Sequence, residues 1–303
     1  MIHIEGEDDG RQAKETELVR TESGTISVPD HMLTVGQLEL ALVSRFPRSD
    51  AQDWDVMGLT VGDPAALVRG VMVALDPTAE AIDACVRAGA NVLVTHHPAF
   101  LSAPTKFSPN AADCSASGST VYRAASEGVA LINLHTALDV SLEAQHVLPG
   151  MLSLDFQRVL QPYPSGTKKG FGQLCTVRAQ DAPFTLGRLA ARCTSVFGRM
   201  PRVWGDMQTP VRRVVCANGS ASSLVDDCIS AHVDCLVCGE VKYHSALAAK
   251  LAGLSIIELG HDTSELPYTA LLAQAVSLAG VDERAVSILD QSGNWDYPES
   301  TRL

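Results

Sequence analysis

The chain has 303 residues, of which 46% are hydrophobic, so it can bury a large core and its length favours two domains or lobes over one. The formal net charge of −12 argues against unspecific binding to nucleic acid, which needs a cationic surface, and no apolar run is long enough to cross a bilayer. The acidic N-terminus lacks the features of a signal peptide, and the eight scattered cysteines fit reduced, buried thiols, so we expect a cytoplasmic protein.

The N-terminal part of the chain divides into an irregular segment and a helix. Residues 1–32 are polar and charged, without helical or strand periodicity, so we expect a mobile acidic arm outside the fold. Residues 34–37 then form a capping-box pattern ahead of an apolar stripe. This pattern predicts the first helix, which should end near Phe46 because a proline follows it.

A short strand is expected after this helix, between Trp54 and a turn at 61–64. Trp54 is interpreted as a core or lobe-packing aromatic residue, because that is how most aromatic side chains are used. Asp55, which follows it, is a candidate to face a site instead.

The stretch from 71 to 98 predicts a strand, a helix and a parallel second strand. Apolar runs at 71–75 and 92–94 read as strands, and the apolar residues between them recur at helical spacing. The second run ends directly in His96 and His97. Ligands of open α/β sheets bind just outside the carboxyl ends of the strands, so these adjacent histidines are candidate site residues.

The next elements lead to a second group of this kind. Residues 100–118 are rich in Ser, Pro, Ala and Asn and predict a surface loop, and a short helix is expected at 120–126. A buried strand at 128–134 then runs straight into the polar segment His135–Asp139. Residues 151–170 contain several prolines and glycines and are expected to be a connection.

The second half of the chain repeats the first. A strand at 173–178, a helix at 185–197 and a strand at 202–204 precede another strand–helix–strand pattern at 211–241. Laying Val71 over Val214 without gaps aligns many apolar positions of the two patterns. Chance similarity between two generic βαβ units is the alternative explanation. We favour two related α/β lobes that face each other across a shared cleft.

Imidazole and carboxylate groups gather at the expected strand ends of both halves. The set comprises His96, His97, His135 and Asp139 from the first half, and Glu240, His244, His261 and Glu265 from the second. These groups, with no thiolate among them, suit Zn²⁺, Mn²⁺, Fe²⁺ or Co²⁺ better than a structural zinc site. Two such ions can generate hydroxide at neutral pH and clamp both oxygens of a phosphate or carbonyl group. A metal site is therefore favoured over a scatter of structural histidines.

Five motifs, in this order, resemble a known family. They are Trp-Asp-x-x-Gly-Leu at 54–59, Thr-His-His-Pro at 95–98, His-Thr-x-x-Asp at 135–139, Gly-Glu-x-Lys-x-His at 239–244 and Gly-His-x-x-x-Glu at 260–265. The family is the Nif-three-like group of ring-forming dinuclear-metal proteins, often labelled GTP cyclohydrolase I type 2 homologs. The resemblance covers residues 33–279 and implies two α/β lobes, a two-metal site in the cleft and a toroidal homohexamer.

The resemblance also implies roles for individual residues. Its metal ligands fall on His96, His97, Asp139, His261 and Glu265. His135 would orient Asp139 from outside the ligand set. Glu240, Lys242 and His244 would line the cleft, and Glu240 or His244 would transfer protons as catalytic residues. One departure is Val56, where the family commonly has Asn, and it weakens the case for a site role of this segment.

The sequence thus predicts an α/β protein with two related lobes that face each other across a metal-binding cleft. We expect an arm at 1–32, a first lobe at 33–160, a second lobe at 161–291 and a tail at 292–303. The favoured function is a dinuclear metal-dependent hydrolase of a nucleotide or related phosphate-bearing small molecule, with two divalent transition-metal ions (Zn, Fe or Mn) per chain. By resemblance its activity would be GTP cyclohydrolase-like. The alternative is a non-catalytic, ring-shaped metal-binding or scaffold protein.

Overall fold

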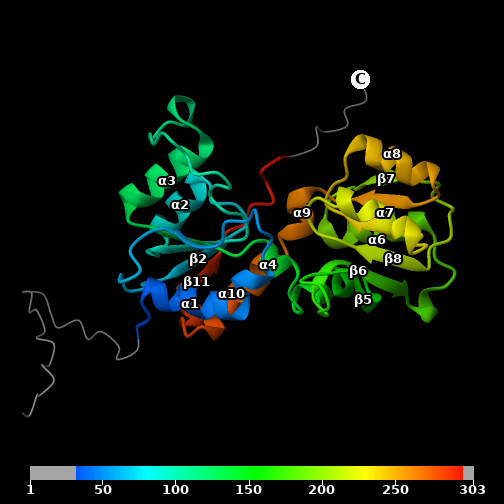
Figure 1. The fold of residues 1–303 in the computed structure, drawn as a ribbon, viewed down its shortest axis with the longest axis horizontal. Helices are drawn as coiled ribbons and strands as arrows, with labels where there is room; N and C mark the ends of the chain where they lie inside the picture. Colours follow the sequence, from blue (N-terminus) through cyan, green and yellow to red (C-terminus); the bar gives the residue numbers. More distant parts are fainter. Residues whose placement is uncertain (1–31, 296–303) are drawn as a thin grey trace, which may run out of the picture. The chain divides into compact units, whose positions relative to one another are not determined.

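Two mixed β-sheets, each flanked by helices, make up the fold (Figure 1). The computed structural model of the protein describes residues 32–295. The predicted arm at 1–32 and most of the predicted tail therefore lie outside the described residues. Residues 33–295 belong to one compact unit. The predicted α/β class is confirmed.

The first sheet has the strand order β1-β4-β3-β2-β11. Its strands are β1 (Gly58–Val61), β2 (Val71–Ala74), β3 (Val92–Thr95), β4 (Ala130–Asn133) and β11 (Val286–Ile288). Its helices are α1 (Val35–Arg45), α2 (Ala79–Arg87), α3 (Ala116–Glu127), the short α4 (Thr136–Asp139) and α10 (Tyr268–Leu278). Strands β2, β3 and β4 are parallel to one another, as the predicted βαβ unit requires.

Alternation along the strands explains why helices cover both faces of this sheet. Val71 and Val73 pack with α1 and α10 on one face. Met72 and Ala74 pack with α2 and α3 on the other face. A strand that is buried on both sides reads as a continuous apolar run, which is the pattern seen at 71–75. The predicted capping box of α1 is present, because Gln37 N donates to Thr34 Oγ1 and Thr34 N donates to Gln37 Oε1.

The second sheet has the strand order β5-β6-β8-β9-β10-β7. Its strands are β5 (Leu154–Pro162), β6 (Gly170–Val177), β7 (Arg202–Trp204), β8 (Arg213–Cys216), β9 (Cys235–Cys238) and β10 (Ser255–Glu258). Its helices are α6 (Leu186–Phe197), α7 (Val225–Ser230), α8 (Tyr243–Leu251) and α9 (His261–Glu265), and the short α5 (Val147–Met151) precedes β5. Helix α6 packs on one face, whereas α7 and α8 pack on the other.

The predicted repeat is present in the backbone pairing of the two sheets. Val71 pairs with Val92 in the parallel β2–β3 ladder, and Val214 pairs with Cys235 in the parallel β8–β9 ladder. The aligned residues therefore occupy the same register. The third strand of each unit, β4 or β10, also carries an antiparallel strand on its outer edge, β1 or β7 respectively.

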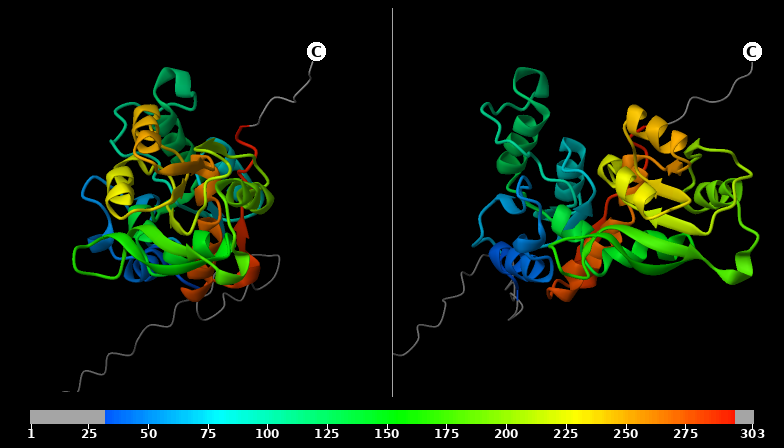
Figure 2. Two further views of the ribbon diagram at one scale, coloured as in Figure 1. Left: turned by 90° about the vertical axis from the view of Figure 1, so that its right-hand side faces the viewer. Right: turned by 45° about the vertical axis from the view of Figure 1, so that its right-hand side comes forward.

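Two predictions about connections were wrong. Residues 151–170 are not only a connection, because β5 forms a long antiparallel hairpin with β6, green in Figure 2. Its burial alternates weakly, since β5 is an edge strand, and the prolines that suggested a loop stand at its end and in the turn. In addition, α10 and β11 return to the first sheet, where β11 pairs in parallel with β2, so the lobes do not follow the division expected at 160 and 291.

The helices and cysteines of the described part agree with the composition. None of the helices between residues 32 and 295 combines the length and the apolar character that crossing a membrane needs. All eight cysteines lie in this part as free thiols, and all but Cys114 are buried. The helix expected at 120–126 begins earlier, at Ala116, because the hydroxyl of Ser115 accepts a hydrogen bond from Gly118 N and caps it.

Candidate metal centre

The ends of strands from both sheets bring four histidines and two carboxylates together. His96 and His97 follow β3, whereas His135 and Asp139 flank and end the short helix α4 that follows β4. His261 and Glu265 begin and end α9, which follows β10. Three overlapping groups of these side chains place one ligand atom per residue within 4.8 Å of one another. The groups are His96–His97–His135, His97–His261–Glu265 and His96–Asp139–Glu265.

Glu265 is the carboxylate around which the imidazoles gather. Its Oε2 atom lies 3.0 Å from His97 Nε2 and 3.2 Å from His261 Nε2. Its Oε1 atom lies 3.8 Å from His96 Nε2, and His96 Nε2 is 3.4 Å from Asp139 Oδ1. Each oxygen of Glu265 therefore faces a different set of ligand atoms.

The second ring nitrogen of every histidine in the cluster is bonded to an acceptor. His96 Nδ1 is 3.2 Å from the carbonyl oxygen of Leu134. The Nδ1 atoms of His97, His135 and His261 lie 2.7, 2.9 and 3.1 Å from carboxylate oxygens of Asp76, Asp55 and Glu240, respectively. A carbonyl or carboxylate oxygen can only accept, so each Nδ1 carries the proton. In the neutral ring this arrangement leaves Nε2 unprotonated, as in histidines that bind metal.

Two buried atoms of the cluster have no hydrogen-bond partner among residues 32–295, although leaving a buried polar atom unpaired is costly. His96 is fully buried and its Nε2 makes no hydrogen bond, although it points toward two carboxylates. Glu265 Oε2 accepts no aligned hydrogen bond either, despite its close imidazole neighbours. Lone pairs that face each other in a buried site are costly unless a cation lies between them. The residues therefore fit a metal ion.

Negative charge within the cluster shifts the pKa values of its groups. Burial would lower the pKa of His97, but its hydrogen bond to Asp76 and the adjacent carboxylate of Glu265 raise it to about 10. The adjacent carboxylate of Glu265 raises the pKa of His261 to about 9. Burial would raise the pKa of Glu265, yet the surrounding imidazoles hold it well below its ordinary value. The carboxylates thus retain protons on these rings when no metal replaces them.

Asp139 connects the two sheets directly. Its Oδ1 accepts a hydrogen bond of 2.6 Å from Asn218 Nδ2, and Asn218 follows the end of β8 in the second sheet. Burial raises the pKa of Asp139, which the nearby charge of Glu265 raises further. The buried hydroxyl of Tyr268, the first residue of α10, has no hydrogen-bond partner, and its ring lies 6.0 Å from that of His96.

The five predicted ligands lie together, and of the two predicted catalytic residues only Glu240 contacts the cluster within residues 32–295. Glu240 is exposed and hydrogen-bonded to His261. His244 is exposed on α8, where its ring packs against Tyr243, and within residues 32–295 no contact joins it to the cluster. Lys242, the residue before α8, is also exposed. His135 differs from its expected role, because a ligand atom of it lies in the cluster and its carboxylate partner is Asp55.

Several residues that hold the cluster in place were not singled out from the sequence. Asp76 follows β2, and Asn218 follows β8, so the strand-end rule that identified His96 applies to both. Asp55 does face the site as suggested, since its second oxygen accepts hydrogen bonds from the amide and hydroxyl of Thr136. Trp54 is not a core residue. It is 54% exposed, and its ring meets that of His135 edge-on at 5.7 Å.

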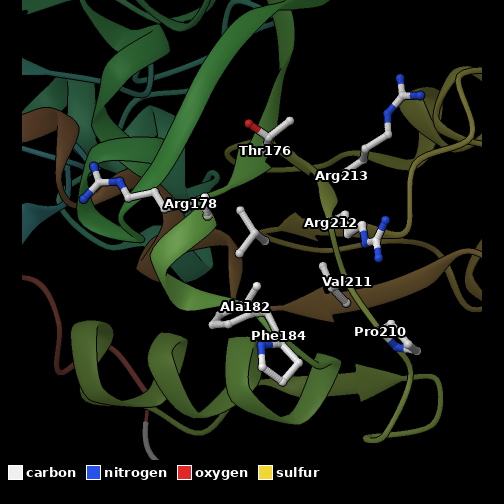
Figure 3. Close-up of a pocket in the computed structure, with 11 residues that line it drawn as sticks. Thr176, Arg178, Ala182, Phe184, Pro210, Val211, Arg212 and Arg213 are labelled. Atoms are coloured by element: carbon white, nitrogen blue, oxygen red, sulfur yellow. The ribbon is translucent and has the colours of Figure 1, made fainter.

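Two cavities reach the cluster. The first, of about 310 Å³, contains Asp139, Glu265, His135 and His261 among its lining, together with Trp54, Phe171, Leu101, Gln52, Gln161, Asn218 and Ser220. The second, of about 400 Å³, is lined by Leu75, Asp76, His97, Glu240, Gly260, His261, Asp262, Asn294 and Trp295. A larger cavity of about 520 Å³ lies beside the β6–β8 ladder around Phe184 and Val211 and contains none of the cluster residues (Figure 3). We therefore assign the site from the metal-ligating side chains that line the two smaller cavities, and not from cavity volume.

A family model described as Duf34/NIF3 (NGG1p interacting factor 3) matches residues 33–291. The chain belongs to the Duf34/NIF3 family. The match spans both sheets and every residue of the cluster. It ends before Asn294 and Trp295, which line the second cavity.

Relatives of the family show the same fold and carry related names. A Streptomyces coelicolor protein named "GTP cyclohydrolase 1 type 2 homolog" is 32% identical over 275 residues, which cover 88% of this chain and 90% of the relative. The crystal structure of the Staphylococcus aureus hypothetical protein SA1388 superposes with a TM-score of 0.75 at 22% identity, over 88% of this chain and all of that one. A Bacillus cereus protein related to NIF3 superposes with a TM-score of 0.74 at 19% identity, over 86% and 97% of the two chains.

Proposed function

We propose that this NIF3-family protein is a dinuclear metal-dependent hydrolase of a nucleotide or related phosphate-bearing small molecule. The observation that carries the proposal is the uniform orientation of four imidazoles. Each Nδ1 is bonded to an acceptor, while the ligand atoms of the four rings gather with Asp139 and Glu265. Purely structural histidines have no reason to share this orientation, whereas metal ligands require it.

The groups favour two ion positions that share one carboxylate. His97, His261 and Glu265 would hold the first ion, and His96, Asp139 and Glu265 the second. Glu265 would bridge, because its two oxygens face the two sets separately. His135 is a further ligand, grouped with His96 and His97. Imidazole and carboxylate ligands without thiolate suit Zn, Fe or Mn.

When bound, two such ions would supply Lewis-acid activation of water and charge neutralisation of a phosphate or carbonyl group. The chain's own residues perform the remaining tasks. Asp55, Asp76 and Glu240 fix the imidazole rings, and Asn218 fixes Asp139. Glu240 lines the second cavity with an exposed carboxylate, so it is the better placed of the two predicted residues to exchange protons with solvent.

The first cavity suits the substrate. Trp54 and Phe171 offer aromatic surface to a planar base, and Gln52, Gln161 and Ser220 offer hydrogen bonds. No lysine or arginine occurs among the described residues that line it. Positive charge toward a phosphate would therefore come from the metal ions. The names of the relatives support a purine nucleotide such as GTP as the first candidate substrate.

Elemental analysis of protein purified without chelator or affinity metal tests the metal centre. We expect about two transition-metal ions per chain, as dinuclear sites require, and fewer in His261→Ala. A nucleotide panel, assayed with that metal, then tests the activity. Turnover that disappears in Asp139→Ala, while the variant remains folded, supports the hydrolase.

A non-catalytic role in metal handling or scaffolding is the competing outcome. Two bound ions without turnover on any nucleotide, together with partner binding that Asp139→Ala leaves unchanged, would replace the hydrolase by this role. Protein that contains no metal and takes up none of Zn²⁺, Mn²⁺ or Fe²⁺ would remove the hydrolase mechanism.

We also propose that the protein assembles as a ring-shaped homohexamer in the cytoplasm, as the family resemblance implies. Helix α8 exposes Tyr243, Leu247 and Leu251 along one face, with exposed fractions of 60%, 36% and 81%. Such a stripe of apolar side chains at a spacing of four residues suits contact with another copy. Light scattering of the purified protein tests the assembly, and a monomer at all concentrations contradicts it.

A further inference from the structure

The last described residues, 289–295, form a C-terminal strap that begins on the first sheet. Leu289 N donates to Val73 O at 2.8 Å and extends the pairing of β11 with β2. Gln291 is buried and anchors the strap, because its Oε1 accepts hydrogen bonds from Leu75 N and Asp76 N at 2.8 and 2.9 Å. The strap is therefore fixed beside the residue that orients His97.

The other end of the strap is bound to elements of the second sheet. Trp295 Nε1 donates to Asp262 Oδ2 at 3.0 Å, and Asp262 follows His261 in α9. Arg199 pairs with the same carboxylate at 2.9 Å, and its guanidinium lies 4.2 Å from the centre of the Trp295 ring. Arg199 also donates to the carbonyl oxygen of Trp295 at 3.1 Å. The strap, red in Figure 1, thus crosses from one sheet to the other.

The strap walls the second cavity, whose chemistry differs from that of the first. Asn294 and Trp295 line it together with His97 and His261. Its lining includes the carboxylates of Asp76, Glu240 and Asp262, of which Asp262 is paired with Arg199, and no lysine or arginine occurs among its described residues. In the first cavity the acidic residues are the ligands themselves, Asp139 and Glu265. A narrow space with carboxylate walls concentrates cations and draws them inward.

We propose that the second cavity is the route by which divalent metal ions enter and leave the centre, and that the C-terminal strap, with Trp295, is its gate. The inference rests on the proposed metal centre and assigns its two cavities different tasks, one for substrate and one for metal. The gate must open for exchange. Side-chain and ring contacts at the surface hold Trp295 to Asp262 and Arg199, and contacts of this kind open far more often than a core does.

The residues proposed as the gate lie beyond residue 291, where the match to the family model ends. We therefore assign the gate to this chain and not to the family. Gln291 is the last residue within the match, and the contacts of Asn294 and Trp295 lie beyond it. The proposed metal ligands and most of the cavity lining lie within the match, whereas Asn294 and Trp295 lie outside it.

Stopped-flow metal exchange on the full chain tests the gate. Chelator-treated protein is mixed with Co²⁺ or Zn²⁺ to follow loading, and loaded protein is mixed with excess chelator to follow release. In Trp295→Ala we expect both rates to rise by roughly tenfold, because one cation–π contact and one hydrogen bond of the strap are lost. The number of ions bound at equilibrium stays the same. Tyr122→Ala, which removes an exposed aromatic side chain on α3, is the matched control and keeps the wild-type rates.

Trp295→Phe serves as the second variant, because it retains an aromatic ring and removes the indole N–H that donates to Asp262. Its exchange rates should fall between those of the wild type and Trp295→Ala. Unchanged rates in both variants overturn the gate. Faster release with unchanged loading also overturns the gate. That result would mean that Trp295 stabilises the bound ion and does not obstruct its passage through the cavity. Wild-type protein that binds no metal overturns the gate and the proposed centre together, whereas normal stoichiometry with unaltered rates overturns the gate alone.

Discussion

Glu265 Oε2 lies 3.0 Å from His97 Nε2, and this pair joins the end of a strand in the first sheet to the helix that follows the last parallel strand of the second. The same oxygen is 3.2 Å from His261 Nε2, while Oε1 faces His96. Glu265 is consequently the residue that both proposed ligand sets share.

Removing this shared carboxylate should therefore cost more metal than removing a ligand of one position. We expect Glu265→Ala to lose both ions, whereas Asp139→Ala keeps about one of the two. Metal content by elemental analysis, after dialysis against metal-free buffer, distinguishes the variants. Glu127→Ala, an exposed carboxylate on α3 that pairs with Arg123, is the control with wild-type content. One ion left in Glu265→Ala would show that the carboxylate does not bridge.

The carboxylates behind the imidazoles should tune the affinity without setting the number of ions. Asp76→Asn weakens the partner of His97 Nδ1, and we expect the metal affinity to fall by roughly 10- to 100-fold with the stoichiometry retained. Competition with a chromophoric chelator measures the change. Asp83→Asn, which touches only the Arg123 pair, should match the wild type. Equal affinities in the two variants would exclude a role for Asp76 in orienting the ring.

Stability of the metal-free protein should decrease as the pH rises. His97 and His261 have pKa values of about 10 and about 9 in the folded chain, above the ordinary value of 6.5, so folding favours their protonated forms. This contribution is complete below pH 6.5 and is lost as the pH passes through 9 to 10. Thermal unfolding of chelated protein across this range should show a falling midpoint.

The same protonation makes metal binding stronger at higher pH, because an ion must displace these protons. Calorimetric titration in buffers of different ionisation enthalpy should detect protons released on loading. A midpoint that does not change with pH in metal-free protein, or loading without proton release, would contradict the assigned pKa shifts.

Glu240 and His244, both expected from the sequence to transfer protons, should behave differently. Glu240→Gln weakens the hydrogen bond to His261 Nδ1, so we expect lower metal affinity together with reduced turnover. His244 packs against Tyr243 on the exposed face of α8, so His244→Ala should retain metal and turnover. Parallel metal analysis and steady-state assays provide the comparison. Loss of turnover with full metal content in His244→Ala would restore it as a proton carrier.

The parts of the fold that follow from local pattern could be read from the sequence. The buried parallel strands β2, β3, β8 and β9 appear as continuous apolar runs because helices cover both of their faces. Strand β5 has no such signal, since it is an edge strand with one weakly buried face. The pairing of β11 with β2 in the first sheet is long-range, and nothing in the three residues of β11 indicates with which strand they pair.

Some residues of the candidate site could likewise be predicted from the sequence, and others could not. His96, His97 and His261 stand at strand ends or a helix start, where chemistry concentrates in α/β folds, and Glu265 ends the short helix that His261 begins. Asp55, by contrast, precedes its strand and reaches His135 across 80 positions of sequence. Only the antiparallel pairing of β1 with β4 brings these two residues together. His135 likewise joins the ligand group because the fold brings its ring within 5.3 Å of the His96 ring and 5.5 Å of the His97 ring. The spacing of these histidines in the sequence does not indicate that they are close.

The β2–β3 and β8–β9 ladders share one register, so the two halves match in backbone pairing. Their side chains at the strand ends differ, because Thr95-His96-His97 in one half corresponds to Cys238-Gly239-Glu240 in the other. Neither copy holds a full ligand set. Any ion held at their junction is consequently a removable cross-link between two separately hydrogen-bonded sheets. Unlike a disulfide, it would be released on unfolding, so its binding free energy would add to the stability of the folded chain, and chelation would remove it without cutting a covalent bond.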